Sequence, residues 1–255
     1  MTKLSSDEHI RYSRQMILPQ IGEQGQEKIR QAKVFVAGLG GLGSVSAYYM
    51  AAVGVGSLTI ADMDMVSPEN LNRQIIHRTY DIARPKTASA LEKLRELNPA
   101  CRIRTIQEEI RDENIRDMIG DCEIILDGTD NIITRKVLNR ISLSKNIPFI
   151  YGGIDGFNGM LTTFIPGETP CFECLFPRKR IQKGKVPALG PVPGLVASLQ
   201  SLEAVKIILG TGGILKSRLL YIQGLDMIFK EIGLERNSEC AICHPPFSGS
   251  SADSH

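Results

Sequence analysis

The sequence predicts an α/β fold: a Rossmann-like, doubly wound and mostly parallel sheet with an antiparallel extension. Three observations predict it. Short β-rich runs alternate with longer helical runs, which is the order of a parallel sheet with crossover helices. A glycine-rich turn at 38–43 follows one of the short runs and opens a helical one. Glycines and alternating residues after Gly153 indicate that the later strands run antiparallel.

The parallel part is expected to begin with a strand at 33–37, whose sequence KVFVA is short and apolar. A helix at 42–53 leads to a second strand at 57–61, SLTIA. The next helix, 86–98, starts just after Pro85, a residue suited to the first turn of a helix. Three more parallel strands are expected, at 102–106, 123–127 and 148–152. A short helix is expected before 123–127, and a longer helix at 131–144 before 148–152.

The antiparallel part is expected to contain a strand at 160–165 and a hairpin at 218–223 and 227–232. The amphipathic run 195–209 predicts a late helix between them. Two further helices are expected upstream of the first strand, packed on the core or on another subunit, at 7–15 and 22–31. The segment 245–255, PPFSGSSADSH, is expected to be a disordered tail.

Composition fits one compact unit, because 255 residues with 42 % apolar content can bury a large core without splitting. The 30 basic and 28 acidic side chains nearly balance, so the chain lacks the basic footprint of a nucleic-acid-binding domain. We expect no membrane span, because no apolar run is expected to reach the roughly 18 residues that a membrane-spanning helix needs. The polar N-terminal segment also has no apolar stretch of the kind found in signal peptides. The expected location is the cytoplasm.

The glycine turn has the context of a nucleotide-binding fingerprint. Its backbone amides and the following helix N-terminus favour phosphate, and we expect this of Gly38, Gly40, Gly41 and Gly43. Asp62 follows the second strand, where a carboxylate accepts hydrogen bonds from ribose hydroxyls. These residues alone favour an NAD-dependent oxidoreductase.

Other residues at the same edge favour a triphosphate. The turn, Asp62 and the DGTDN stretch at 127–131 each follow a strand, so all three are expected to face one crevice. Asp130 can hold magnesium there, or it can cap the following helix. Arg73 and Lys86 flank the crevice, and two cations with a metal site suit the charge on a departing pyrophosphate.

Two Cys-x-x-Cys pairs predict a tetrahedral zinc site formed by four thiolates, Cys171, Cys174, Cys240 and Cys243. Two disulfides are the alternative, which a cytosolic chain disfavours. A single redox-active pair is another, but it leaves the second pair without a role. A closed site of this kind is structural, and it would pin the C-terminal segment to the segment after the sixth strand.

Several motifs in one order resemble the MoeB/ThiF/HesA family of the ubiquitin-activating enzyme superfamily. They are RYSRQMILPQIG, GLGGLGS, ADMDMVSPENLNRQ, ARPK, DGTDN and the two cysteine pairs, and together they run from about residue 11 to 243. The resemblance implies a homodimer that uses ATP and magnesium to adenylate the C-terminal glycine of a small ubiquitin-like sulfur-carrier protein ending in Gly-Gly. It implies one adenylation domain over 1–244, with N-terminal helices at 1–32, a nucleotide-binding part at 33–152, and the antiparallel extension, crossover loop and zinc site at 153–244.

The resemblance also implies roles for individual residues. Gly41 lies at the phosphate loop and Asp62 binds ribose. Asp130 holds magnesium, with Asn131 beside it in the nucleotide site. Arg14 reaches the phosphates of the neighbouring subunit as an arginine finger. The ATP contacts come from Asn70, Arg73 and Lys86.

The chain departs from the family between the cysteine pairs, because 175–239 contains no cysteine. Many relatives have one there, and some use it for a covalent intermediate. Cys101 and Cys122 are expected to serve packing. We therefore expect adenylation without a catalytic cysteine, and a separate sulfur donor protein.

Alternatives remain open from the sequence, one of which is an NAD-dependent oxidoreductase, disfavoured by the cysteine pairs and by Asp130. The acceptor can be a short peptide or a tRNA base, although the near-neutral charge weighs against tRNA. The chain can be an inactive scaffold, which the presence of Arg14, Arg73, Lys86 and Asp130 disfavours. The basic run at 178–185 is either a solvated crossover or an electrostatic guide for an acidic carrier.

Overall fold

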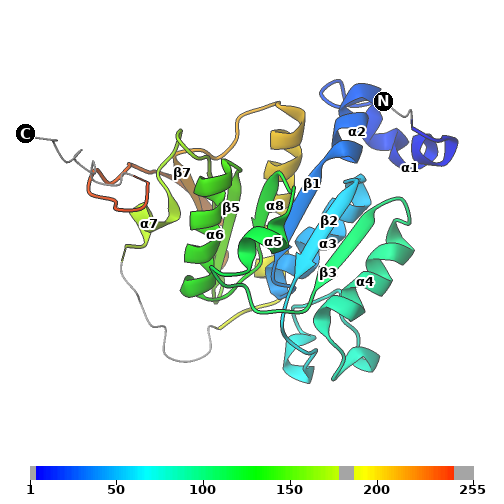
Figure 1. Cartoon of the computed structure of the whole chain (residues 1–255), viewed down its shortest axis with the longest axis horizontal. Helices are drawn as coiled ribbons and strands as arrows, with labels where there is room; N and C mark the ends of the chain where they lie inside the picture. Colours follow the sequence, from blue (N-terminus) through cyan, green and yellow to red (C-terminus); the bar gives the residue numbers. More distant parts are fainter. Residues whose placement is uncertain (1–3, 178–186, 244–255) are drawn as a thin grey trace, which may run out of the picture.

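The computed structural model describes residues 4–177 and 187–243 (Figure 1). The expectations for the basic run at 178–185 and for the tail at 245–255 lie outside these residues. One sheet of eight strands organises the described chain, in the order β3-β2-β1-β4-β5-β6-β7-β8. The strands are β1 Lys33–Ala37, β2 Ser57–Ala61, β3 Arg102–Ile106, β4 Ile124–Asp127, β5 Phe149–Asp155, β6 Asn158–Phe164, β7 Arg218–Gln223 and β8 Ile228–Gly233.

The predicted change of strand direction is confirmed. The pairs from β3 through β5 are all parallel, and those from β5 to β8 are all antiparallel. The order runs outward from β1 in both directions, which is the doubly wound arrangement. Its consequence is that β1, β2 and β4 end at the same edge of the sheet, with β1 between the other two.

Helices cover both faces of the sheet. They are α1 Ser6–Met16, α2 Gly22–Gln31, α3 Gly41–Val53, α4 Lys86–Leu97, α5 Ile115–Ile119, α6 Ile132–Lys145, α7 Phe172–Leu175 and α8 Pro191–Leu209. Side chains alternate along β1, so Val34 and Val36 join one apolar core with α3, α4 and α8. Phe35 and Ala37 face the other core, with α5, α6 and α7. The protein is therefore a three-layer sandwich.

Most expected helices lie within one or two residues of their predicted bounds, but α8 begins four residues earlier than 195. The additional first turn carries Pro191 and Pro193, and proline is a residue typical of turns. Proline has no N–H to lose in the first turn, where no intrahelical acceptor exists, so the helix includes both. The short 3-10 helices Pro68–Asn70 and Thr79–Asp81 and the four-residue α7 were not predicted.

The expectation that no apolar run is long enough to cross a membrane was wrong for α8. That helix, with 19 residues, is long enough and apolar enough in composition to span a membrane. Of its apolar 18-residue stretch, 44 % is buried inside the structure. It packs on β5, β6 and α3. Val196, Ala197 and Ala204 are fully buried there, as expected of a core helix.

The two N-terminal helices pack at the end of α3 farthest from the glycine turn. A Cβ at Gly54, which caps that end of α3, would lie 2.5 Å from the Tyr12 ring on α1. Gln15 on α1 and Gln26 on α2 both donate to the Val53 carbonyl, at 2.8 and 3.0 Å. In Figure 1, α1 and α2 accordingly lie at the opposite end of the parallel strands from the cyan segment that follows β2.

Candidate active site and metal centre

The glycine turn and the DGTDN stretch touch directly, as the common edge of β1 and β4 predicts. Gly38 has φ +84°, and a Cβ placed on it would lie 2.8 Å from the Gly128 carbonyl oxygen. A Cβ on Gly43 would lie only 1.8 Å from the Gly38 oxygen, so the turn is as tight as a backbone allows. The N-terminus of α3 begins at Gly41, so its free amides and helix dipole can attract phosphate at this place.

Asp62 lies beside this turn. Its Oδ2 accepts from the Leu39 amide at 2.6 Å and its Oδ1 from the Asp64 amide at 2.7 Å. The side chain is 8 % exposed, and this burial raises its pKa while nearby Lys86 opposes the rise. The structure therefore brings the predicted ribose ligand to the glycine turn.

Lys86 begins α4, and its ammonium lies between two carboxylates. The Nζ atom is 2.7 Å from Asp64 Oδ2 and 3.9 Å from Asp62 Oδ2, and the side chain is 5 % exposed. Asp64 is 53 % exposed, so a phosphate can replace that partner without entering the core. Lys86 is thus a preformed cation at the carboxyl end of β2.

Asn70 and Arg73 lie in the segment between β2 and α4. The Asn70 oxygen accepts from the Ser67 amide at 3.1 Å, which leaves the amide nitrogen as the group that can meet a ligand. The Arg73 side chain passes over the glycine turn, with its Cγ 3.6 Å from where a Cβ on Gly41 would stand. Its Nη1 donates to the Glu69 carbonyl at 2.9 Å and to Asn72 Oδ1 at 3.0 Å.

The helix cap after β4 is Asn131, not Asp130. Asn131 Oδ1 accepts from the Thr134 amide at 2.8 Å, so of its amide group only the nitrogen remains for a nucleotide. Asp130 is exposed, and none of the described residues gives its carboxylate a hydrogen bond or ion pair. A free carboxylate beside the glycine turn suits a hard cation such as magnesium. The capping alternative for Asp130 is therefore wrong.

Arg14 does not join these residues within one chain. It is exposed in the last turn of α1, which packs on the far end of α3. The 13 residues of α3 separate that end from the glycine turn by about 20 Å. Any contact of Arg14 with nucleotide would have to be made in another copy of the chain.

Residues at the start of α8 that pack against the glycine turn could not be identified from sequence patterns. Pro193 in α8 lies 3.0 Å from where a Cβ on Gly41 would stand, and Gly190 packs on the Asn72 carbonyl. Buried His77 also lies in the β2–α4 segment, with Nδ1 2.9 Å from the Ser89 hydroxyl, and burial lowers its pKa to about 4. Only the fold brings 190–193 next to 41 and 72.

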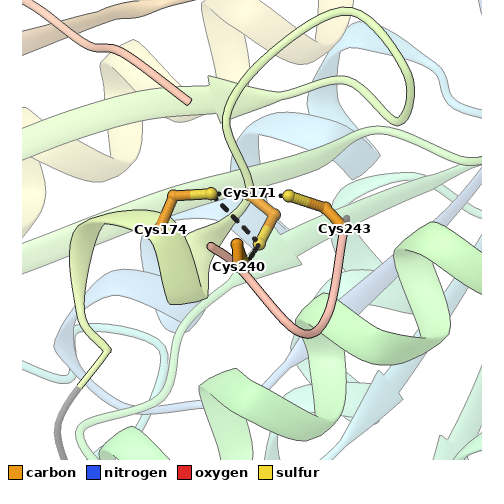
Figure 2. A group of neighbouring side chains, drawn as sticks. All are labelled: Cys171, Cys174, Cys240 and Cys243. Atoms are coloured by element: carbon orange, nitrogen blue, oxygen red, sulfur yellow. Dashed lines mark hydrogen bonds between the residues drawn. The ribbon is translucent and has the colours of Figure 1, made fainter. Parts of the chain in front are cut away.

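The four cysteines converge, as Figure 2 shows, with sulfurs contributed by the α7 region and by 240–243. All four Sγ atoms lie within 4.8 Å of one another, and neighbouring pairs are separated by 3.4 to 3.8 Å. Four thiolates at about 2.3 Å from one zinc ion stand about 3.8 Å apart, whereas a disulfide joins sulfurs at about 2.05 Å. The donor set and its geometry fit zinc.

The surroundings of the thiols also favour a cation. Burial raises the pKa of Cys171 and raises that of Cys243 to about 11, whereas at Cys240 the effect of burial is outweighed by hydrogen bonds from the backbone amides of Cys243 and Ile242, which lower the pKa. Buried thiolates therefore need a positive partner at neutral pH, and zinc binds thiols in the deprotonated form. The cysteine tetrad (Cys171, Cys174, Cys240 and Cys243) lies against Phe172, which packs in the apolar core with Phe149 and Tyr151.

Removing one sulfur of the tetrad is expected to cost stability. Cys174→Ser should lose the bound metal and about 4 kcal/mol of unfolding free energy, which is roughly 8–16 °C in Tm for a domain of this size. Metal content by mass spectrometry and thermal unfolding measure both. A chelator should lower the Tm of the wild type and leave that of the variant unchanged. Wild-type protein without stoichiometric metal, with all four native thiols reactive, would contradict the assignment.

Comparison with known proteins gives one consistent set of relatives. A model described as the ThiF family matches residues 12–242. The SAMP-activating enzyme E1 of Haloferax volcanii is 36 % identical over 239 residues, covering 91 % of this chain and 88 % of that protein. The sulfur carrier protein adenylyltransferase of Thermus thermophilus is 36 % identical over 250 residues, covering 94 % and 92 %.

Longer relatives and solved structures agree. The adenylyltransferase and sulfurtransferase MOCS3 of Drosophila sechellia is 37 % identical over 248 residues, covering 95 % of this chain and 55 % of that protein. The crystal structure of E. coli MccB with ATP superposes with a TM-score of 0.82 at 22 % identity, covering 91 % of this chain and 74 % of that one. PaaA superposes with a TM-score of 0.79 at 25 % identity, covering 92 % and 76 %. The likeness to MccB supports the fold.

Proposed function

The chain belongs to the ThiF family, and we propose that it adenylates the C-terminal glycine of a small ubiquitin-like sulfur-carrier protein with ATP and magnesium. One observation carries the proposal: the glycine turn, Lys86, Arg73 and the exposed carboxylate of Asp130 lie at one edge of the sheet. The names of two relatives of nearly equal length describe activation of SAMP or of a sulfur carrier.

The two cations beside the glycine turn suit a triphosphate. A dinucleotide needs the glycine turn and a ribose carboxylate, and both are present. Lys86 and Arg73 add two cations beside the turn, where they can neutralise charge on a departing pyrophosphate. Family membership and these cations together replace the oxidoreductase reading.

The reaction needs no general base. The α-carboxyl of the carrier has a pKa of about 3.3–3.7 and is ionised at neutral pH, so it attacks the α-phosphorus directly. An oxygen–phosphorus bond forms to the carboxylate as the bond to the bridging oxygen breaks, and pyrophosphate leaves with the electron pair. The protein must align the two reactants and stabilise charge on the phosphates.

Each site residue has a role in this scheme. The amides of the glycine turn and the N-terminus of α3 bind phosphate, and Asp62 accepts from ribose. Lys86 and Arg73 stabilise charge on the transferring and leaving phosphates, with Asn70 as a further donor. Asp130 would hold magnesium, which when bound supplies positive charge to the phosphate oxygens.

The proposal includes a homodimer, because Arg14 can serve only in another copy of the chain. Its guanidinium is exposed on α1, and no described residue engages it. Nearby Ile10 and Ile17 are 75 % and 73 % exposed, an apolar surface on the same helix and its cap that a partner can bury. In a two-fold dimer each Arg14 then reaches the phosphates of its partner, as an arginine finger.

We expect no covalent link between enzyme and carrier. Cys101 is 5 % exposed in one core, and burial raises its pKa to about 11. Cys122 is 6 % exposed in the other, where its thiol lies 3.7 Å from the Thr59 hydroxyl. Neither can present a thiolate to the crevice. A separate protein then supplies the sulfur.

A denaturing gel without reductant tests this directly. Enzyme, carrier and ATP should give no band at their combined mass, and the variant Cys101→Ala/Cys122→Ala should keep the wild-type rate of adenylation. A thiol-sensitive adduct that disappears in either single variant would overturn the absence of a covalent step.

The function itself is tested by ATP–pyrophosphate exchange. The wild type should exchange labelled pyrophosphate into ATP only when a carrier ending in Gly-Gly is present. The same carrier without its last glycine is the control and should support no exchange. Exchange with a short peptide but with no carrier would establish the peptide alternative, and exchange with neither would refute the proposal.

A further inference from the structure

Below the exposed Asp130 lies an arginine that the reaction scheme does not use. The guanidinium of Arg135 on α6 makes three hydrogen bonds. Its Nε donates to Asp127 Oδ2 at 2.8 Å, and its Nη2 to the carbonyls of Thr129 at 2.6 Å and Gly152 at 2.9 Å. The Asp127 side chain is fully buried and that of Arg135 is 14 % exposed. An ion pair this deep would be costly without these hydrogen bonds.

These bonds fix the backbone just before Asp130. The other Asp127 oxygen accepts from both the amide and the hydroxyl of Thr129, at 2.9 and 2.7 Å. The Thr129 carbonyl belongs to the peptide group that contains the Asp130 nitrogen, so Arg135 orients that peptide plane. On the other side, Asn131 is held by its cap on α6. The Asp130 backbone is thus fixed from both sides, while its carboxylate makes no hydrogen bond or ion pair with a described residue and lies within electrostatic reach of Arg135.

Neighbouring elements hold the arginine itself. Its guanidinium carbon lies 5.0 Å from the centre of the Tyr151 ring, a cation–π contact, and its bond to Gly152 ties α6 to β5. Gln200 on α8 donates to the carbonyls of Asp127 and Ile150, at 2.9 and 3.1 Å. Residues 127–129 are therefore held by α6 and α8, and β5 holds Arg135 itself.

We propose that Arg135 is a positioning residue that sets the direction of the Asp130 carboxylate and thereby the affinity of the site for the nucleotide-bound divalent cation. The proposal rests on the proposed function for the identity of that cation. The planar fork of arginine matches Asp127 and two carbonyls at once, whereas the single ammonium of lysine cannot. Residues that orient a metal ligand in this way commonly contribute 10–100-fold to metal affinity.

The test compares Arg135→Lys with Lys136→Met. Lys136 is the next residue on α6, its side chain is 13 % exposed, and it pairs with Glu173 at 3.2 Å, away from the loop. Arg135→Lys should raise the magnesium concentration for half-maximal pyrophosphate exchange by about 10-fold or more, with the rate recovering at high magnesium. Lys136→Met should keep the wild-type magnesium dependence, whatever its effect on Tm.

A second readout needs no activity. Amide hydrogen exchange in the magnesium-free protein should speed up at residues 128–131 in Arg135→Lys and stay unchanged there in Lys136→Met. If Arg135→Lys does not fold, Asp127→Asn, which weakens the same pair at constant volume, should show both effects. Unchanged magnesium dependence and unchanged exchange at 128–131 would overturn the positioning role. A wild type without pyrophosphate exchange would refute the proposed function instead. The hydrogen-exchange comparison would still decide whether Arg135 fixes the backbone at residues 128–131.

Discussion

Asp130→Ala is expected to abolish carrier-dependent pyrophosphate exchange and to leave the protein folded. The carboxylate is exposed and no described residue binds it, so its loss should change stability by no more than about 0.5 kcal/mol. The rate should fall at least about 100-fold, because the charge that holds the cation at the phosphates is gone. Exchange rate and Tm, measured on the same preparation, separate the two effects.

Arg73→Ala should give the same result for a different reason. Among the described residues its guanidinium bonds to a carbonyl and an amide oxygen of its own segment, so its removal leaves no described buried charge unpaired. The transferring phosphate loses a cation beside the glycine turn. Asp117→Ala removes an exposed carboxylate on α5 and is the matched control for Asp130→Ala; it should keep full exchange. Exchange close to the wild-type rate in both Asp130→Ala and Arg73→Ala would contradict the site.

The second large effect concerns Arg14. Arg14→Ala alone should lose most activity although the residue lies about 20 Å from the crevice of its own chain. Mixing Arg14→Ala with Asp130→Ala subunits should restore part of it. Half of randomly assembled dimers are hybrids, and each hybrid has one site with both residues intact, so about a quarter of the wild-type rate should return.

Subunit mixing distinguishes an arginine that acts across the dimer from one that acts within its chain. If Arg14 served its own site, every site in the mixture would lack either Arg14 or Asp130, and no activity would return. The mixture of Asp130→Ala with Arg73→Ala is the control, because both residues belong to the same crevice and its hybrids have no intact site. Activity restored in that control would contradict the assignment of Asp130 and Arg73 to one site.

The sequence predicts those parts of the site that depend on short segments. The glycine turn, Asp62 and the DGTDN stretch each follow a strand, and parallel strands bring such ends together without further information. The cysteine pairs likewise predict their own convergence, because two ligands from each pair are what a tetrahedral site needs.

Contacts between distant segments could not be predicted. The position of Pro193 over Gly41 depends on how α8 packs on β5 and β6. The first turn of α8 contains two prolines, which are residues typical of turns. The role of Arg135 could not be predicted either, because spacing along a helix does not reveal that this side chain turns toward buried Asp127. The choice of Asn131 over Asp130 as helix cap depends on a one-residue boundary, which patterns resolve poorly.

The central claim is that a carrier carboxylate attacks the α-phosphorus of ATP in this crevice. It is tested most directly by a carrier whose terminal carboxylate carries heavy oxygen, incubated with enzyme, ATP and a nucleophile that cleaves the acyl-adenylate at its carbonyl. One labelled oxygen should then appear in the AMP released and none in the pyrophosphate. Label-free AMP formed in step with carrier consumption would contradict the account.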